Sequence, residues 1–265
     1  NLSTHTPAPS IAYNSIHPQH THTHFAGVCR HPNTTNLHTH GLHVSSNCLT
    51  VGSCQDDVFQ TVLPGETKLY TYDIPLDHMG GLFWYHPHHH GSISLQAGGG
   101  AVGFIVIEDA PGEVPPEVEA MEEMLMFMLH LDMSAQQELQ QLFNSDSLWQ
   151  VTGTPATVWL VNGQSTPTVT VEPNTWYRWR MVFGALGTAA ELTFSDPSCE
   201  MRLLAKDGVF LMDAGRPVTS IRLFPGARAD VAVRCSAVGS YTLGASTETL
   251  GTVRRRLHNH PGGGG

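Results

Sequence analysis

The stretch GLFWYHPH, residues 81–88, decides the fold of this chain. It is a short run of aliphatic and aromatic residues that begins at a glycine and ends around a proline. KLYTYDIP (68–75) and AVGFIVIED (101–109) have the same character, and each lies between Gly, Pro or Asp residues. Short β-branched and aromatic runs separated by turn residues are typical of a β-sandwich. We therefore expect residues 37–110 to form an all-β domain.

Residues 111–120 are rich in Pro and Glu, and we interpret them as a linker. After this linker the pattern of short apolar runs between turn residues resumes. Residues 124–133, MLMFMLHLDM, predict a strand buried on both faces, and residues 134–143 predict a helix. Further strands are expected in TVTVEP (168–173), TWYRWRMVF (175–183), MRLLAKDGVFL (201–211), ADVAVRC (229–235) and SYTLGAS (240–246). The organisation is thus an irregular arm over 1–36, two tandem Greek-key β-sandwiches over 37–110 and 121–250, and a flexible tail over 251–265.

Charge and hydropathy exclude two classes of partner. The formal net charge is −10, with 13 basic residues against 23 acidic ones, so no basic stripe is available to neutralise nucleic-acid phosphates. No apolar run reaches the length of a transmembrane segment. The sequence predicts neither a nucleic-acid partner nor a membrane span.

The cysteines and two glycosylation patterns favour an oxidising compartment. Cys48 with Cys54, and Cys199 with Cys235, are spaced so that each pair can close a disulfide within one domain. Asn1 and Asn33 each begin an Asn-x-Ser/Thr sequence. We expect an exported glycoprotein, secreted or in another oxidising lumen.

Two His-x-His pairs point to a metal. His38 with His40, and His86 with His88, would each project two imidazoles from one face of a strand. Pro87 cannot donate to a sheet ladder, so the second pair should lie at a strand end or a sheet edge. Imidazole ligands suit copper, zinc, nickel or iron and exclude calcium and magnesium. Because the expected zinc-hydrolase motifs, with their acidic residue, are missing, copper is favoured and zinc is the alternative.

These residues resemble the multicopper oxidase family, which includes the laccases. NLHTHGLHVS, DDVFQTVLPGE, IPLDHMGGLFWYHPHHHGS and QAGGGAVGFIVIED look like the first cupredoxin domain of that family, and VNGQ, KDG and PGARAD resemble its second. In the family, four such pairs hold a trinuclear copper cluster that reduces dioxygen to water. The resemblance implies that His38 is a ligand of the type 2 copper and that His40, His86 and His88 are type 3 ligands.

The remaining candidates near the motifs have lesser expected roles. We expect His90 to be a neighbour of the ligands, and His43, His78 and His89 to be structural or solvated imidazoles. The resemblance places Asp56 or Asp57 where the family has an acidic residue along the dioxygen path.

One family motif is missing from the sequence. The blue copper of the family needs His-Cys-His, and none of the five cysteines has a histidine beside it. The chain alone therefore carries no complete catalytic centre, and we expect a C-terminal cupredoxin domain or a partner chain to complete the cluster. The alternatives are a non-catalytic cupredoxin-like structural or assembly subunit and, less favoured, a zinc-dependent hydrolase.

Overall fold

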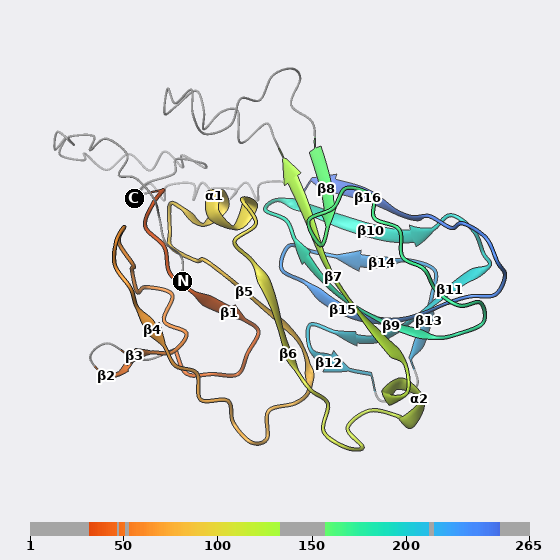
Figure 1. Ribbon diagram of the computed structural model, residues 1–265, viewed down its shortest axis with the longest axis horizontal. Coiled ribbons are helices and arrows are strands. Elements are labelled where there is room, and N and C mark those ends of the chain that lie inside the picture. The colour runs from red at the N-terminus through yellow and green to blue at the C-terminus, as the bar shows by residue number, and fades with distance from the viewer. Residues whose placement is uncertain (1–31, 47, 51–52, 133–156, 212–214, 250–265) are drawn as a thin grey trace, which may run out of the picture.

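The chain is nearly all β in the computed structural model, which describes residues 32–46, 48–50, 53–132, 157–211 and 215–249 (Figure 1). Within these residues the two helices are α1 (Ile93–Gly98) and α2 (Pro116–Glu119). With six and four residues, neither helix of the described chain is long enough to cross a bilayer. The all-β prediction is confirmed.

The first domain is built on a three-stranded antiparallel sheet. Its order is β1 (His38–His40), β5 (Gly81–His86) and β6 (Gly103–Ile107), so that β5 is central. A second small sheet contains β2 (Cys48–Thr50), β3 (Ser53–Cys54) and β4 (Leu69–Tyr70). The segment GLFWYH is therefore the central strand of this sheet.

The second domain is a sandwich of two sheets. The larger sheet has the order β12-β11-β15-β9-β7-β8, with β13 also paired to β11, and the smaller has the order β14-β10-β16. The strands are β7 (Glu122–Asp132), β8 (Thr157–Val161), β9 (Tyr177–Gly184), β10 (Thr188–Phe194), β11 (Cys199–Lys206), β12 (Val209–Phe210), β13 (Arg216–Val218), β14 (Ile221–Leu223), β15 (Arg228–Cys235) and β16 (Leu243–Thr249). In Figure 1 the first domain lies on the left and the second on the right, with the long β7 along their boundary.

The main core fills the space between the two sheets of the second domain. Met181 of β9 and Val231 of β15 meet Leu192 of β10 and Leu223 of β14 there, and all four are almost fully buried. Side chains of a strand alternate between its faces, so the opposite face of β9 needs a second partner. The first domain supplies that partner.

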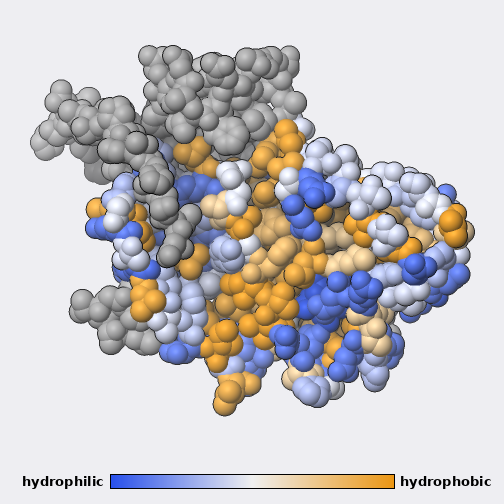
Figure 2. Space-filling view, viewed as in Figure 1, coloured by the Kyte–Doolittle hydropathy of each residue, from blue (hydrophilic) through white to orange (hydrophobic). Residues whose placement is uncertain are grey.

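A smaller apolar cluster joins the two domains. Leu82 and Trp84 of β5 pack against Phe127 of β7 and Val182 of β9, with Phe104 of β6 beside them. The Trp84 and Phe104 rings lie 5.6 and 5.5 Å from the Phe127 ring. Figure 2 shows apolar side chains gathered along the middle of this face, where β6 and β7 adjoin. The two domains thus share a core, which fixes how the β5 strand faces the second domain.

Buried charges make a second connection between the domains. Arg178 and Arg180 on β9 are each 1% exposed, and both pair with the buried Asp230 of β15. Arg178 also pairs with Asp109, which follows β6, and with Glu123 at the start of β7. An arginine with this many carboxylate partners is a fixed link between strand ends.

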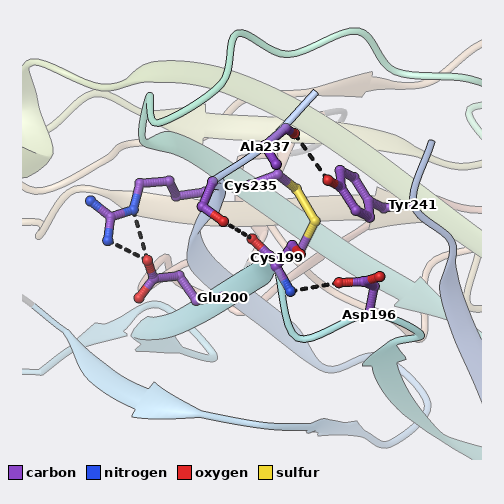
Figure 3. The surroundings of a disulfide bond; sticks show 9 residues. Asp196, Cys199, Glu200, Cys235, Ala237 and Tyr241 are labelled. Carbon is purple, nitrogen blue, oxygen red and sulfur yellow. Dashed lines mark hydrogen bonds and ion pairs between the residues drawn. A yellow bond between two sulfur atoms is a disulfide. The ribbon is translucent and has the colours of Figure 1, made fainter. Parts of the chain in front are cut away.

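Cys199 and Cys235 form a disulfide with an S–S length of 2.05 Å, the pairing considered from the sequence (Figure 3). They are opposite each other in the antiparallel pair β11–β15. Beside them Arg234 donates to Glu200, which continues the cross-strand contact. Cys48 and Cys54 are also register partners, between β2 and β3, but their side chains lie outside the described part.

Two local expectations differ from the structure, and three others fall wholly or mostly outside the described residues. TVTVEP (168–173) forms no strand, because Pro167 and Pro173 bracket it and remove backbone donors. The KLYTYDIP strand is reduced to Leu69–Tyr70. The helix expected at 134–143, most of the arm and the tail lie outside the described residues.

Candidate metal centre

The first His-x-His pair is set by strand alternation. His38 and His40 project from one face of β1, while Thr39 between them is buried on the other. The antiparallel register places His38 opposite His86 of β5. One ring nitrogen each of His38, His40 and His86 lies within 4.8 Å of the other two. The fold therefore gathers three imidazoles from two neighbouring strands.

The second pair is built differently from the first. β5 ends at His86, so Pro87 and His88 follow the strand end, as expected from the proline, but His88 and His90 are not on a strand face. Instead the buried Asn36 holds this segment, accepting a hydrogen bond of 2.6 Å from the His88 backbone N–H. The His88 ring centre comes to 5.1 Å from the His38 ring centre. Sequence reasoning missed Asn36, because it placed this residue in the irregular arm.

A carboxylate orients His38. Asp56 accepts hydrogen bonds from Nδ1 of His38, at 2.9 Å, and from the backbone N–H of Thr39, at 2.7 Å. Burial alone would raise the pKa of Asp56, but these hydrogen bonds outweigh it and hold the pKa below its usual value. The ionised carboxylate fixes the proton of His38 on Nδ1, so Nε2 is free to bind a metal. The structure places Asp56 at the site, whereas Asp57 accepts from Phe59 and Gln60 instead.

A backbone carbonyl orients His86. Its Nδ1 donates to the carbonyl oxygen of Pro87 at 2.9 Å, which leaves Nε2 as an acceptor. Nδ1 of His40 lies 3.3 Å from that Nε2. Since one of two hydrogen-bonded nitrogens must donate, His40 carries its proton on Nδ1 in the metal-free chain, an assignment that follows from the hydrogen-bond network. Nδ1 of His40 and Nε2 of His86 thus face a common point.

Burial keeps these imidazoles neutral. It lowers the pKa of His40 to about 4, with a further contribution from the nearby Arg228. Burial also lowers the pKa of His86 to about 4, and it lowers that of His88, with His38 contributing. Neutral imidazole is the form that binds metals. The cluster can therefore offer its lone pairs at neutral and mildly acidic pH.

The cluster opens into a cavity of about 200 Å³ between the two domains. Trp84 contacts two of the imidazoles, stacked on His40 at 4.9 Å and on His86 at 4.2 Å between ring centres. The second domain contributes His130, which is 6% exposed and was not singled out from the sequence. The lining consists of His38, His40, Trp84, His86, His88, Ile93, Ala97, Gly98, Val102, Leu129, His130, Leu131, Gly184, Ala185, Leu186, Pro225 and Gly226.

The other histidines of the two motifs lie outside this cluster. The exposed His90 has its ring 5.6 Å from that of His88 and 6.3 Å from that of Phe59. The rings of His43 and His78 lie 5.0 Å apart, inclined by 40°, and Nε2 of His78 accepts from the His43 backbone N–H. The backbone carbonyl of His89 accepts from Ser92 at the start of α1.

The donor set fits copper. All candidate ligand atoms are imidazole nitrogens, and Nδ1 of His88 is buried with no hydrogen-bond partner among the described residues. A buried polar atom of this kind is costly unless something binds it. Imidazole donors suit copper and zinc alike, so the geometry alone does not choose between the two metals.

Comparisons with known proteins identify the family. Sequence models described as multicopper oxidase match residues 13–112 and 130–262. A search of curated proteins found no match.

Solved multicopper oxidases share the fold. The enzyme from Pseudomonas thermotolerans is 24% identical, covering 80% of this chain and 48% of its own, with a TM-score of 0.56. A metallo-oxidase from Campylobacter jejuni is 21% identical over 80% of this chain and 41% of its own, with a TM-score of 0.59. The blue copper oxidase of Nitrosomonas europaea is 18% identical, covering 83% of this chain and 64% of its own, with a TM-score of 0.57.

The chain spans less than half the length of the first two of these structures. The family match does not depend on them, because one of the sequence models by itself accounts for half of the chain. Two cupredoxin-like sandwiches, a cluster of imidazoles between them and both family matches agree: the chain belongs to the multicopper oxidase family.

Proposed function

We propose that this chain supplies half of a trinuclear copper cluster. His38 is the ligand of the type 2 copper, and His40, His86 and His88 are ligands of the type 3 pair. The observation that carries the proposal is the approach of three imidazole nitrogens, from His38, His40 and His86, to within 4.8 Å of one another. Three imidazoles at this spacing, each oriented by a hydrogen bond, are suited to metal binding.

The chain's own residues hold the ligands ready. Asp56 fixes the Nδ1 proton of His38, the Pro87 carbonyl fixes that of His86, and Asn36 anchors the His88 backbone. When bound, copper at such a cluster would pass electrons taken from an oxidised substrate to dioxygen and so reduce it to water. Leu129 and Leu186 of the second domain add apolar side chains to the lining of the cavity beside the imidazoles.

The remaining ligands would come from a further cupredoxin domain or from a partner chain. Two facts support this: the chain spans 48% and 41% of two similar multicopper oxidases, and its own sequence contains no His-Cys-His. The cavity beside the imidazoles is where such a unit would bring its histidines. The electron donor would then be oxidised on that unit, and this chain would take part only in the reduction of dioxygen.

Export to an oxidising compartment is part of the proposal. Asn33 is exposed and begins an Asn-x-Thr sequence, and Cys199 is disulfide-bonded to Cys235. Both features are typical of secreted glycoproteins. Asn1, the other candidate glycosylation site, lies outside the described residues.

Metal analysis tests the proposed function. Copper and zinc per chain would be measured on natively purified protein and on His86→Ala, with the exposed His43→Ala as the matched control. We expect copper in excess of zinc, lost in His86→Ala and kept in His43→Ala. Zinc without copper would instead support a zinc-dependent enzyme. Equal metal contents in all three proteins, or no metal in any, would leave a non-catalytic cupredoxin-like subunit.

A further inference from the structure

His40 belongs to the first domain, yet the backbone of the second domain lies against its ring. A Cβ atom built on Gly226 would come to 2.8 Å from Cε1 and 3.3 Å from Nε2 of His40. Real Cβ contacts are essentially never as short as the first of these distances. Gly226 also has a φ of +80°, a conformation that glycine adopts without strain. Only a residue without a side chain allows this approach.

The turn that contains Gly226 is held firmly in the second domain. The Gly226 backbone N–H donates to the carbonyl of Phe183 at 2.8 Å, and Phe183 donates to Ala227 at 3.0 Å. Ala227 in turn donates to Phe224 at 2.9 Å. The first two bonds tie the turn to the end of β9 and the third closes the turn itself, so a clash with His40 would move the imidazole more readily than the turn.

Arg228, next to this turn, fixes the turn to the first domain. Its guanidinium donates to the carbonyls of Leu82, at 3.3 Å, and Asp207, at 3.0 Å, and it is 6% exposed. A Cβ on Gly41, the residue after His40, would come to 2.3 Å from this guanidinium. His40 and Gly41 therefore lie in direct contact with the turn of the second domain and with Arg228 beside it.

Trp84 closes the other side of the His40 ring. Its indole stacks on the imidazole with ring centres 4.9 Å apart and planes inclined by 21°. In its place between Trp84 and Gly226, the His40 ring has Nδ1 at 3.3 Å from Nε2 of His86.

We propose that Gly226 is a positioning residue for the metal centre: the second domain, without providing a type 2 or type 3 ligand, sets the position of the His40 imidazole beside His86. The metal part of this inference rests on the proposed function. The positioning itself does not, because the metal-free chain already has the Nδ1 proton of His40 directed at His86. It is therefore measurable without metal.

The test compares variants of the 265-residue chain. Gly226→Ala adds the clashing Cβ. Gly163→Ala is the matched control, because Gly163 has a φ of +78° but no atom within 4 Å of its Cβ position. Gly226→Asn guards against misfolding, since Asn tolerates positive φ while it still carries the Cβ. Long-range ¹⁵N–¹H spectra of the histidine rings report the tautomer of each metal-free variant, and competition with a chelator reports its copper(II) affinity.

We expect an Nδ1–H tautomer for His40 in the unsubstituted chain and in Gly163→Ala, and a shift toward Nε2–H in both Gly226 variants. Copper affinity should fall by about 10- to 100-fold in the Gly226 variants only, the usual effect of losing a group that orients a ligand. An unchanged tautomer and affinity in Gly226→Asn would overturn the inference, as would equal losses in Gly163→Ala. A tautomer shift in a chain that binds no copper would uphold the positioning and refute the proposed function instead.

Discussion

Replacement of Asp56 by Asn would test the orientation of His38 with almost no change in volume. The carboxylate now accepts two hydrogen bonds, from His38 at 2.9 Å and from the Thr39 backbone at 2.7 Å. The amide of Asn has only one oxygen, and this oxygen would accept the hydrogen bond from the Thr39 N–H. The NH₂ group of the amide would then face Nδ1 of His38. His38 would then accept at Nδ1 and carry its proton on Nε2, where the metal should bind.

The expected loss of copper affinity is about 10- to 100-fold, or about 1.4–2.7 kcal/mol. The assay is copper(II) competition with a chelator at pH 7, with Asp57→Asn as the control. Asp57 is the adjacent carboxylate and bonds to Phe59 and Gln60 away from the cluster. Equal copper affinities for the two variants would refute the reasoning, because the two variants differ only in whether the lost carboxylate faces an imidazole.

Three further results are expected. The metal-free chain should lose stability as the pH falls from about 6.5 to about 4. In this window His40 and His86 take up protons in the unfolded chain, near pH 6.5, but in the folded chain only near pH 4. A urea midpoint that stays constant between these pH values would contradict this prediction. Replacing both Cys199 and Cys235 by Ala should cost about 4 kcal/mol of unfolding free energy, from the loop of 36 residues that they close, and an unchanged urea midpoint would be incompatible with this. Arg178→Met should cost roughly 3–5 kcal/mol in the same measurement, since it leaves Asp230 buried with fewer partners; a loss below 1 kcal/mol would count against a structural role of the pair.

The sequence predicted the strands that alternate clearly or are buried on both faces. Residues 175–183 and 229–235 read as strands, and they became β9 and β15 at the centre of the large sheet. β10 and β14 were not expected, because the first is rich in Ala and the second has three residues, too few to show a period. TVTVEP alternates well but has prolines at its borders. Local pattern therefore predicted the sheets better than their edges.

For the candidate site too, features set by neighbouring residues were predicted, and features set by contacts between distant segments were not. The His38–His40 spacing is enough to predict two imidazoles on one face, since both lie on β1. Nothing local shows that His88 lies beyond its strand, or that Asn36 holds it from 52 residues away. The choice between Asp56 and Asp57 likewise depends on a pairing across the fold. Contacts between distant segments carry no periodicity, so they had to come from the structure.

The shared core explains why a metal centre on the first domain needs the second. Leu82, Trp84 and His86 lie on one face of β5, and the first two pack on Phe127 and Val182 of the second domain. A shift of β5 by one residue would turn all three side chains to the opposite face, so this packing also fixes the direction of His86. The same contact buries the imidazoles and lowers their pKa values. Without the second domain, the histidines would be solvated, protonated at mildly acidic pH and free to turn, and the spacing in the sequence alone would not make a metal site.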